Sequence, residues 1–207
     1  MGEEILKKYE AKRLPLYYSF LKRTFDIIAS LIGLIIGIPI VIITCILVVI
    51  ESKGNPIFCQ KRVGLNNREF NMYKVRSMRM DAEKNGAQWA EKNDPRVTKV
   101  GKFIRKTRID EIPQLYNVLK GDMTFVGPRP EREVFYKEFE KDISNFRERL
   151  KVKPGVTGYA QVHGGYDVTP AEKLELDLYY IEHMSVGMDL KMIFKTVSVI
   201  FTGDGAR

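Results

Sequence analysis

Two adjacent carboxylates, Asp110 and Glu111, lie at the centre of a polar stretch of the chain. Basic side chains accompany the pair, with Arg105 before it and Arg129 after it. Neighbouring acids among fixed cations are typical of a site where a nucleophile and a divalent metal ion act on a phosphorylated substrate. The sequence therefore predicts phosphate chemistry centred on residues 110 and 111.

Two rigid segments further along the chain carry cations that suit phosphate. Arg129 lies between Pro128 and Pro130, which restrict the backbone around it, and a guanidinium can bond two phosphate oxygens at once. The segment from Lys153 to Val162 predicts a second rigid, glycine-containing loop with a cation. Solvated surface turns would explain one such segment, but explain all of them together poorly.

A simpler interpretation of Asp110 is that it caps a helix. Pro113 suits a first helical turn and Gly121 suits a helix end, so Asp110 is expected at or just before a helix N-terminus. There it could serve only as an N-cap. The same geometry would hold a phosphate beside the carboxylate, and the local pattern leaves both interpretations open.

The segment 27–50 contains 24 residues and no charge. As a helix it would extend about 36 Å, enough to cross a hydrocarbon core of about 30 Å. The run is longer than the apolar region of a signal peptide, and a buried helix of a soluble domain is the alternative. We expect a membrane segment.

Pro39 lies near the middle of this segment and is expected to break or kink the helix. Either a bent spanning helix or a re-entrant helix–break–helix hairpin would result. Residues 1–26 carry a net charge of +2 and residues 51–207 carry +6. Positive flanks tend to stay in the cytoplasm, so the pattern favours the re-entrant hairpin. Residues 1–26, which mix basic and aromatic side chains, predict an interfacial segment.

The whole chain has 207 residues, a net charge of +8 and two cysteines, Cys45 and Cys59. So few cysteines indicate a reducing, cytosol-facing location. A basic chain suits phosphorylated small molecules, anionic lipid or nucleic acid. A membrane-tethered module that binds anionic lipid or nucleic acid is therefore an alternative function, but no basic stripe interleaved with stacking aromatics is present, and we expect no nucleic-acid partner.

Patterns beyond the membrane segment predict an α+β fold in which helices predominate. Residues 57–63 and 69–75 predict a β-hairpin around a Gly/Asn turn. Helices are expected at 99–106, 131–150, 170–183 and 189–201. We therefore divide the chain into an interfacial segment (1–26), a membrane helix broken at Pro39 (27–50) and a catalytic domain with a few short strands (51–207).

Four motifs in this order closely resemble the bacterial sugar transferases called monotopic phosphoglycosyl transferases. These motifs are Tyr73–Met78 (YKVRSM), Asp110–Met123 (DEIPQLYNVLKGDM), Val126–Pro130 (VGPRP) and Lys153–Val162 (KPGVTGYAQV). The resemblance extends from about residue 22 to the C-terminus. Over this length the chain is similar to the minimal catalytic form of the family.

This resemblance implies transfer of a sugar-1-phosphate from a UDP-sugar to undecaprenyl phosphate, the first membrane step of glycan assembly. It further implies Mg²⁺, a covalent phosphosugar on Asp110, a metal ligand in Glu111, and a catalytic domain on the cytoplasmic face of the bacterial membrane. Arg105 and Arg129 would bind phosphate, and weaker candidates for anion contacts are Arg62, Arg76 and Lys153. The sugar and the pathway stay open, and a homodimer is compatible with the sequence.

Overall fold

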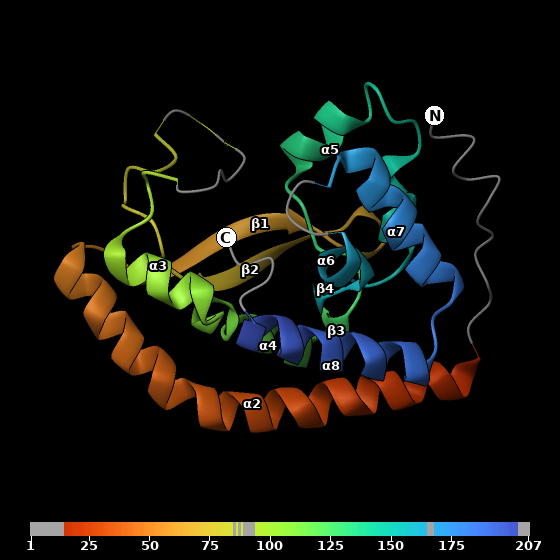
Figure 1. Ribbon diagram of the computed structural model, residues 1–207, viewed down its shortest axis with the longest axis horizontal. Coiled ribbons are helices and arrows are strands. Elements are labelled where there is room, and N and C mark those ends of the chain that lie inside the picture. Colours follow the sequence, from red (N-terminus) through yellow and green to blue (C-terminus); the bar gives the residue numbers. More distant parts are fainter. Residues whose placement is uncertain (1–14, 85, 87, 89–93, 165–167, 203–207) are drawn as a thin grey trace.

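The computed structural model describes residues 15–84, 86, 88, 94–164 and 168–202 (Figure 1). The first 14 residues of the predicted interfacial segment and the last five residues of the chain lie outside the described residues. The described part is α+β and predominantly helical, as the sequence predicts.

A single long helix, α2 (Leu16–Glu51), contains the whole predicted membrane segment. It starts directly after Pro15 and runs through the predicted boundary at residue 26. It also includes Pro39 without interruption, so the predicted break at this proline is wrong: the loss of one backbone hydrogen bond can bend a long helix without ending it. Figure 1 shows α2 bowed, with the remainder of the molecule on its concave side. Among the described residues this is the one helix long and apolar enough to cross a membrane, judged by length and composition.

Two small sheets accompany the helices. Strands β1 (Ile57–Val63) and β2 (Glu69–Val75) pair antiparallel, so the predicted hairpin is confirmed to the residue. Strands β3 (Thr124–Val126) and β4 (Gly155–Thr157) pair in parallel. The remaining helices are α3 (Lys99–Lys106), α4 (Gln114–Lys120), α5 (Glu133–Phe139), α6 (Tyr159–His163), α7 (Pro170–Glu182) and α8 (Val186–Thr202).

Local capping explains two helices that the sequence predicts correctly. The Thr98 side chain accepts a hydrogen bond from Gly101 N at the start of α3. Thr169 and Glu172 form a reciprocal capping box at the start of α7, with Pro170 in its first turn. These signals lie within a few residues of one another, which is why the sequence alone reveals them.

Two elements predicted beyond the membrane segment are wrong. Residues 131–150 do not form one helix: α5 ends at Phe139, and a 3-10 helix (Phe146–Lys151) begins after Asn145, whose φ is +65°. The reversal brings the rings of Phe139 and Phe146 together in an edge-on contact 5.1 Å between centroids. Residues 153–162 are not a loop, because they form β4 and α6. Pairing with β3, about 30 residues away in the chain, creates this strand.

The main core lies between α5, α7 and α8, where Tyr136, Phe146, Leu174 and Met192 are fully buried. Helix α4 lies between this region, the hairpin and α2 (Figure 1). Buried Asn117 joins α4 to β2, because its side chain accepts from Tyr73 N at 3.2 Å and donates to Asn71 O at 2.7 Å. These bonds fix the segment that carries the acidic pair.

Glycines of α2 allow this segment to pack directly on the long helix. A Cβ placed on Gly37 would lie 2.6 Å from Ile112 Cγ2, and one on Gly33 would lie 2.7 Å from Leu115 Cδ1. Ile112 follows Glu111 immediately. Helix α2 therefore packs directly against the segment that carries the acidic pair.

Candidate active site

Asp110 and Glu111 lie in a tight 3-10 turn (Ile109–Glu111) between α3 and α4. Arg108 begins the turn with a φ of +58°, and both acids are buried, at 6% and 9% exposure. The N-cap of α4 is Pro113, so the interpretation of Asp110 as the cap of this helix is wrong. The turn instead directs two neighbouring carboxylates into the interior.

Glu111 is held by cations from three parts of the chain. Its Oε1 atom lies 2.8 Å from Arg129 Nη2, 3.2 Å from Lys74 Nζ and 3.7 Å from Arg108 Nη1. Burial alone would raise the pKa of Glu111, but Arg129, Lys74 and Arg108 hold it far below its ordinary value of 4.5. Glu111 is therefore a permanent anion that orders the surrounding cations.

Asp110 has a different environment although it is the adjacent residue. Its Oδ1 atom is buried and has no hydrogen-bond partner among the described residues. Burial raises the pKa of Asp110 above 3.8, and the repulsion from Glu111 acts in the same direction, whereas Lys74 and Arg105 oppose the rise. A desolvated carboxylate oxygen without a partner is the more reactive of the two groups.

Arg105 joins the pair from α3. Its Nε donates to Ser77 Oγ at 2.9 Å, and its charge lowers the pKa of Asp110. Helix α3 approaches this region closely because residue 101 is a glycine: a Cβ there would lie 1.9 Å from Ser77 O. Arg105 and Arg129, the two main predicted phosphate ligands, thus lie near the same acidic pair, and their contact with phosphate stays a prediction.

The three weaker candidates have no described contact with the acidic pair. Arg62 contacts Glu131 Oε2 at 3.1 Å and Pro130 O at 3.2 Å, behind Arg129. Arg76 donates to the carbonyls of Ser52 and Lys53, just after α2. Lys153 lies beside Gly121 and Arg23, at the opposite end of α4 from the acids. Contacts between these three cations and substrate stay predictions.

Lys74 is a site residue that the sequence reasoning missed. It lies on β2, and burial lowers its pKa while Glu111 opposes the change. A signal was present, because Lys74 belongs to the motif Tyr73–Met78 and is flanked by Val75, a core residue. The pairing of a strand lysine with Glu111, 37 residues later, depends on the tertiary fold.

The acids could hold a metal ion only together with other ligands. Within the part of the chain that the structure describes, no group of three or more His, Cys, Asp or Glu side chains is placed to bind a metal. Mg²⁺ commonly uses one or two carboxylates together with substrate phosphate oxygens. The partnerless Oδ1 of Asp110 suits that arrangement, whereas Oε1 of Glu111 is already surrounded by cations.

Comparison with known proteins gives a consistent result. Residues 17–203 match the model of a family described as bacterial sugar transferase. A UDP-N-acetylgalactosamine-undecaprenyl-phosphate N-acetylgalactosaminephosphotransferase of Aeromonas hydrophila is 47% identical over 193 residues, which cover 92% of this chain and 46% of that protein. An undecaprenyl-phosphate galactose phosphotransferase of Salmonella typhimurium is 41% identical over 202 residues, covering 90% and 42%.

A Bacillus subtilis protein, provisionally described as an undecaprenyl-phosphate N-acetylgalactosaminyl 1-phosphate transferase, is 54% identical over 133 residues, which cover 64% of this chain and 74% of that protein. The chain spans about half or less of the length of the Aeromonas and Salmonella relatives. The family match nevertheless extends over nearly the whole chain. The chain belongs to the bacterial sugar transferase family.

Proposed function

We propose that this protein transfers a sugar-1-phosphate from a UDP-sugar to undecaprenyl phosphate, with a covalent phosphosugar on Asp110 as the intermediate. One observation carries the assignment of the nucleophile. Of two adjacent buried carboxylates, Glu111 is neutralised by three cations, and Asp110 keeps a buried oxygen that has no partner in the described part of the chain.

In the first step, a carboxylate oxygen of Asp110 attacks the phosphorus that carries the sugar. The bond from this phosphorus to the oxygen bridging the two phosphates breaks, and UMP leaves with that oxygen. In the second step, a phosphate oxygen of undecaprenyl phosphate attacks the same phosphorus. The bond to Asp110 then breaks, which restores the carboxylate and releases the undecaprenyl-diphosphate sugar.

The surrounding cations would stabilise the charge that develops on the leaving UMP. Arg105 and Arg129 flank Asp110 from opposite parts of the chain, and both lower its pKa. Glu111 fixes Arg129 and Lys74, so these groups need little reorganisation during the reaction. Glu111 thus supports catalysis mainly by ordering cations.

Mg²⁺ belongs to the proposal because a diphosphate donor carries phosphate oxygens that would complete its ligand set beside Asp110. When bound, the ion would neutralise charge on these oxygens. Of the two acids, Asp110 is the better fit as its carboxylate ligand. The cations around Oε1 of Glu111 disfavour a further role of this residue as a metal ligand.

For the donor, we propose UDP-N-acetylgalactosamine. The two relatives named for N-acetylgalactosamine are 47% and 54% identical to this chain, and the galactose relative is 41% identical. The N-acetyl group distinguishes these donors chemically, because it presents an amide where galactose has a hydroxyl.

The contacts of α2 favour a re-entrant placement in the cytoplasmic leaflet. Near its start, Lys22 forms an ion pair of 2.7 Å with Asp189, and Asp26 accepts from Phe125 N at 3.0 Å. At its end, Glu51 accepts from the backbone of Lys99 and Val100 at 2.7 and 2.8 Å. One polar domain therefore touches both ends, whereas a spanning helix would leave its ends on opposite sides of the bilayer.

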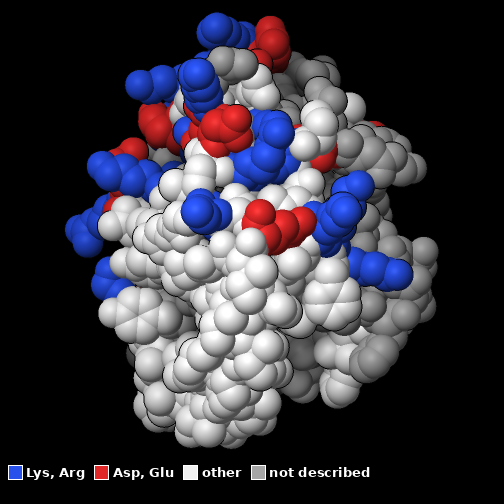
Figure 2. Space-filling view, turned by 90° about the vertical axis from the view of Figure 1, so that its left-hand side faces the viewer, with Lys and Arg blue, Asp and Glu red and all other residues white. Residues whose placement is uncertain are grey.

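The outer side of α2 is apolar along its length. Isoleucines on this side are exposed, with Ile35 at 72% and Ile50 at 76%. Figure 2 shows charged side chains in the upper part of one face of the molecule and, among the described residues in view, none in the lower part, where α2 lies. This division suits insertion of the bowed helix into the membrane with the charged surface in the cytoplasm.

The test is release of UMP by nanodisc-held protein with undecaprenyl phosphate, Mg²⁺ and a panel of UDP-sugars. We expect the highest kcat/KM with UDP-N-acetylgalactosamine, and loss of release in EDTA and in Asp110→Asn. A preference for UDP-galactose would contradict the donor assignment alone. Absence of release with every donor, from folded protein, would contradict the function.

A further inference from the structure

A buried ion pair lies directly behind the Arg129 segment and has no part in the reaction as described so far. Arg149, from the 3-10 helix Phe146–Lys151, and Asp177, from α7, are 0% and 1% exposed and lie 2.6 Å apart. The nitrogen that contacts Asp177, Nη2, also donates to Arg129 O at 2.9 Å. Asp177 therefore fixes the atom that holds the backbone of Arg129.

This bond belongs to a continuous row. Four successive backbone carbonyls, from Pro128 to Glu131, each accept a hydrogen bond from a distant part of the chain. Their donors are, in order, Gly155 N (3.0 Å), Arg149 Nη2 (2.9 Å), Arg62 Nη1 (3.2 Å) and Val63 N (2.9 Å). Two of these four donors are arginine side chains, so ion pairs inside the domain control this stretch of backbone.

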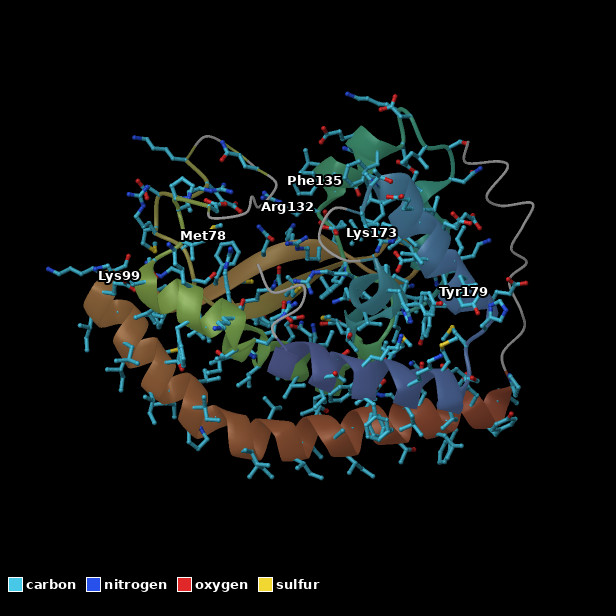
Figure 3. All side chains as sticks on the ribbon, viewed as in Figure 1. Met78, Lys99, Arg132, Phe135, Lys173 and Tyr179 are labelled. Atoms are coloured by element: carbon cyan, nitrogen blue, oxygen red, sulfur yellow. The ribbon has the colours of Figure 1, made fainter. Side chains whose placement is uncertain are left out.

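Helix α7 supplies an ion-pair partner both for Arg149 and for Glu131. Asp177 holds Arg149, and Lys173, one turn earlier on the same face, forms an ion pair with Glu131. Figure 3 shows Lys173 on the side of α7 that faces the hairpin. The other carboxylate oxygen of Glu131 contacts Arg62. The Arg129 segment is thus tied to α7 at two places, at the Arg129 carbonyl through Arg149 and Asp177, and at Glu131 through Lys173.

We propose that Arg149, held by Asp177, is a positioning residue that sets the place of the Arg129 guanidinium on Glu111 and on the substrate phosphate. This inference rests on the proposed function of Arg129. Stability alone does not require a buried ion pair here, since a hydrophobic pair of similar volume commonly stabilises a core equally well. What such a pair lacks is a donor for Arg129 O.

The test separates stability from positioning through the double variant Arg149→Met/Asp177→Leu. We expect its Tm to stay within a few degrees of the wild type, because both charges are removed together. We expect its kcat to fall about 100-fold, because displacement of a catalytic group by about 1 Å has that effect, with a smaller change in the KM for undecaprenyl phosphate. Arg149→Lys keeps a charge and a donor, and should recover most of kcat.

A matched control is Arg147→Met, which removes an arginine of the same 3-10 helix that pairs instead with Glu133 and Glu140. Its kcat should match the wild type. Wild-type turnover by the folded double variant would overturn the inference. If the double variant does not fold, Arg149→Lys and Asp177→Asn provide the test, because both retain a donor at residue 149. A kcat that falls only as far as the loss of Tm explains would overturn the inference.

Hydrogen exchange provides a readout that does not depend on turnover. The peptide that covers residues 126–132 should exchange faster in the double variant than in the wild type, and Arg149→Lys should restore its protection. Equal protection in all variants would overturn the positioning role even in an active enzyme. Inactivity of the wild type with every donor, alongside lost protection in the double variant, would instead count against the proposed function of the site.

Discussion

Asp110 and Glu111 are neighbours in the chain, but the pKa of Asp110 is raised and that of Glu111 is lowered. Glu111 accepts a bond of 2.8 Å from Arg129, and its pKa lies far below 4.5 because Arg129, Lys74 and Arg108 outweigh the effect of burial. Asp110 keeps a buried oxygen without a described partner, and burial raises its pKa. This difference separates a reactive carboxylate from an ordering one, and most of the predictions below depend on it.

Replacement of Asp110 by asparagine should abolish turnover without harming the fold. We expect UMP release below about 0.1% of the wild type, because no covalent intermediate can form. Since the ionised carboxylate is disfavoured by burial, its removal should leave Tm unchanged or higher. The matched control is Asp142→Asn, at an exposed position, which should keep full activity. Turnover above a trace in pure protein would exclude Asp110 as the nucleophile.

Glu111→Gln should lower stability as well as activity. The change leaves the partly buried cations Arg129 and Lys74 without their shared anion, for which we expect a loss of roughly 2–3 kcal/mol in the free energy of unfolding. Thermal or denaturant unfolding in detergent measures it. Glu69→Gln, which breaks an exposed pair with Lys61, should change stability by less than about 0.5 kcal/mol. Equal effects of the two substitutions would show that the cations on Glu111 are not ordered by it.

On acidification, activity should decline at a higher pH than stability does. As the proposed nucleophile, Asp110 would have to be ionised, and its raised pKa should place the acidic limb of kcat/KM above the ordinary value of 3.8. Glu131 acts in the opposite sense: burial would raise its pKa, but Lys173 and Arg62 lower it from 4.5 to about 2. Its contribution to stability is therefore complete above pH 4.5 and is lost as the pH falls toward 2.

We thus expect activity to decline on acidification before Tm begins to fall. Parallel measurements of kcat/KM and Tm from pH 8 downward, in steps of about half a unit, test this. A decline of activity that coincides with the decline of Tm would mean that unfolding, rather than protonation of Asp110, limits the enzyme at low pH.

A side chain at Gly37 should disturb the acidic pair from the membrane side. Gly37→Val places a Cβ about 2.6 Å from Ile112 Cγ2, and the overpacking should lower the free energy of unfolding by about 1–3 kcal/mol. Activity should fall further than stability, because Ile112 adjoins Glu111. Gly187→Ala on α8 is the control, since no atom lies within 4 Å of the added Cβ. Unchanged kcat in Gly37→Val would contradict direct support of the site by α2.

The re-entrant placement predicts that both flanks of α2 face the cytoplasm. Cys59 is exposed on β1 and serves as one reporter, and a cysteine added at the N-terminus serves as the other in a Cys45→Ser background. A membrane-impermeant maleimide should label both in inverted vesicles and neither in intact spheroplasts. Labelling of the two cysteines from opposite sides would establish a spanning helix.

Elements with strong local signals could be predicted from the sequence. The hairpin follows from two alternating segments and the turn at Asn66 and Asn67, which take positive φ values of 53° and 62°. Helix α7 follows from Thr169 and Pro170. The helix predicted at 131–150 failed because burial of Phe139 and Phe146 against each other reverses the chain at Asn145, and helical periodicity cannot anticipate that reversal.

By itself, the sequence determined the apolar helix, the hairpin, and the presence of an acidic pair near Arg105 and Arg129, because each depends on residues close together or on motifs of fixed spacing. Only the tertiary structure decided which acid is free and which is paired. Lys74 reaches Glu111 across 37 residues, and Arg149 reaches the backbone of Arg129 across 20. Charge environments in a folded chain depend on burial and on distant partners, and neither is encoded in local spacing.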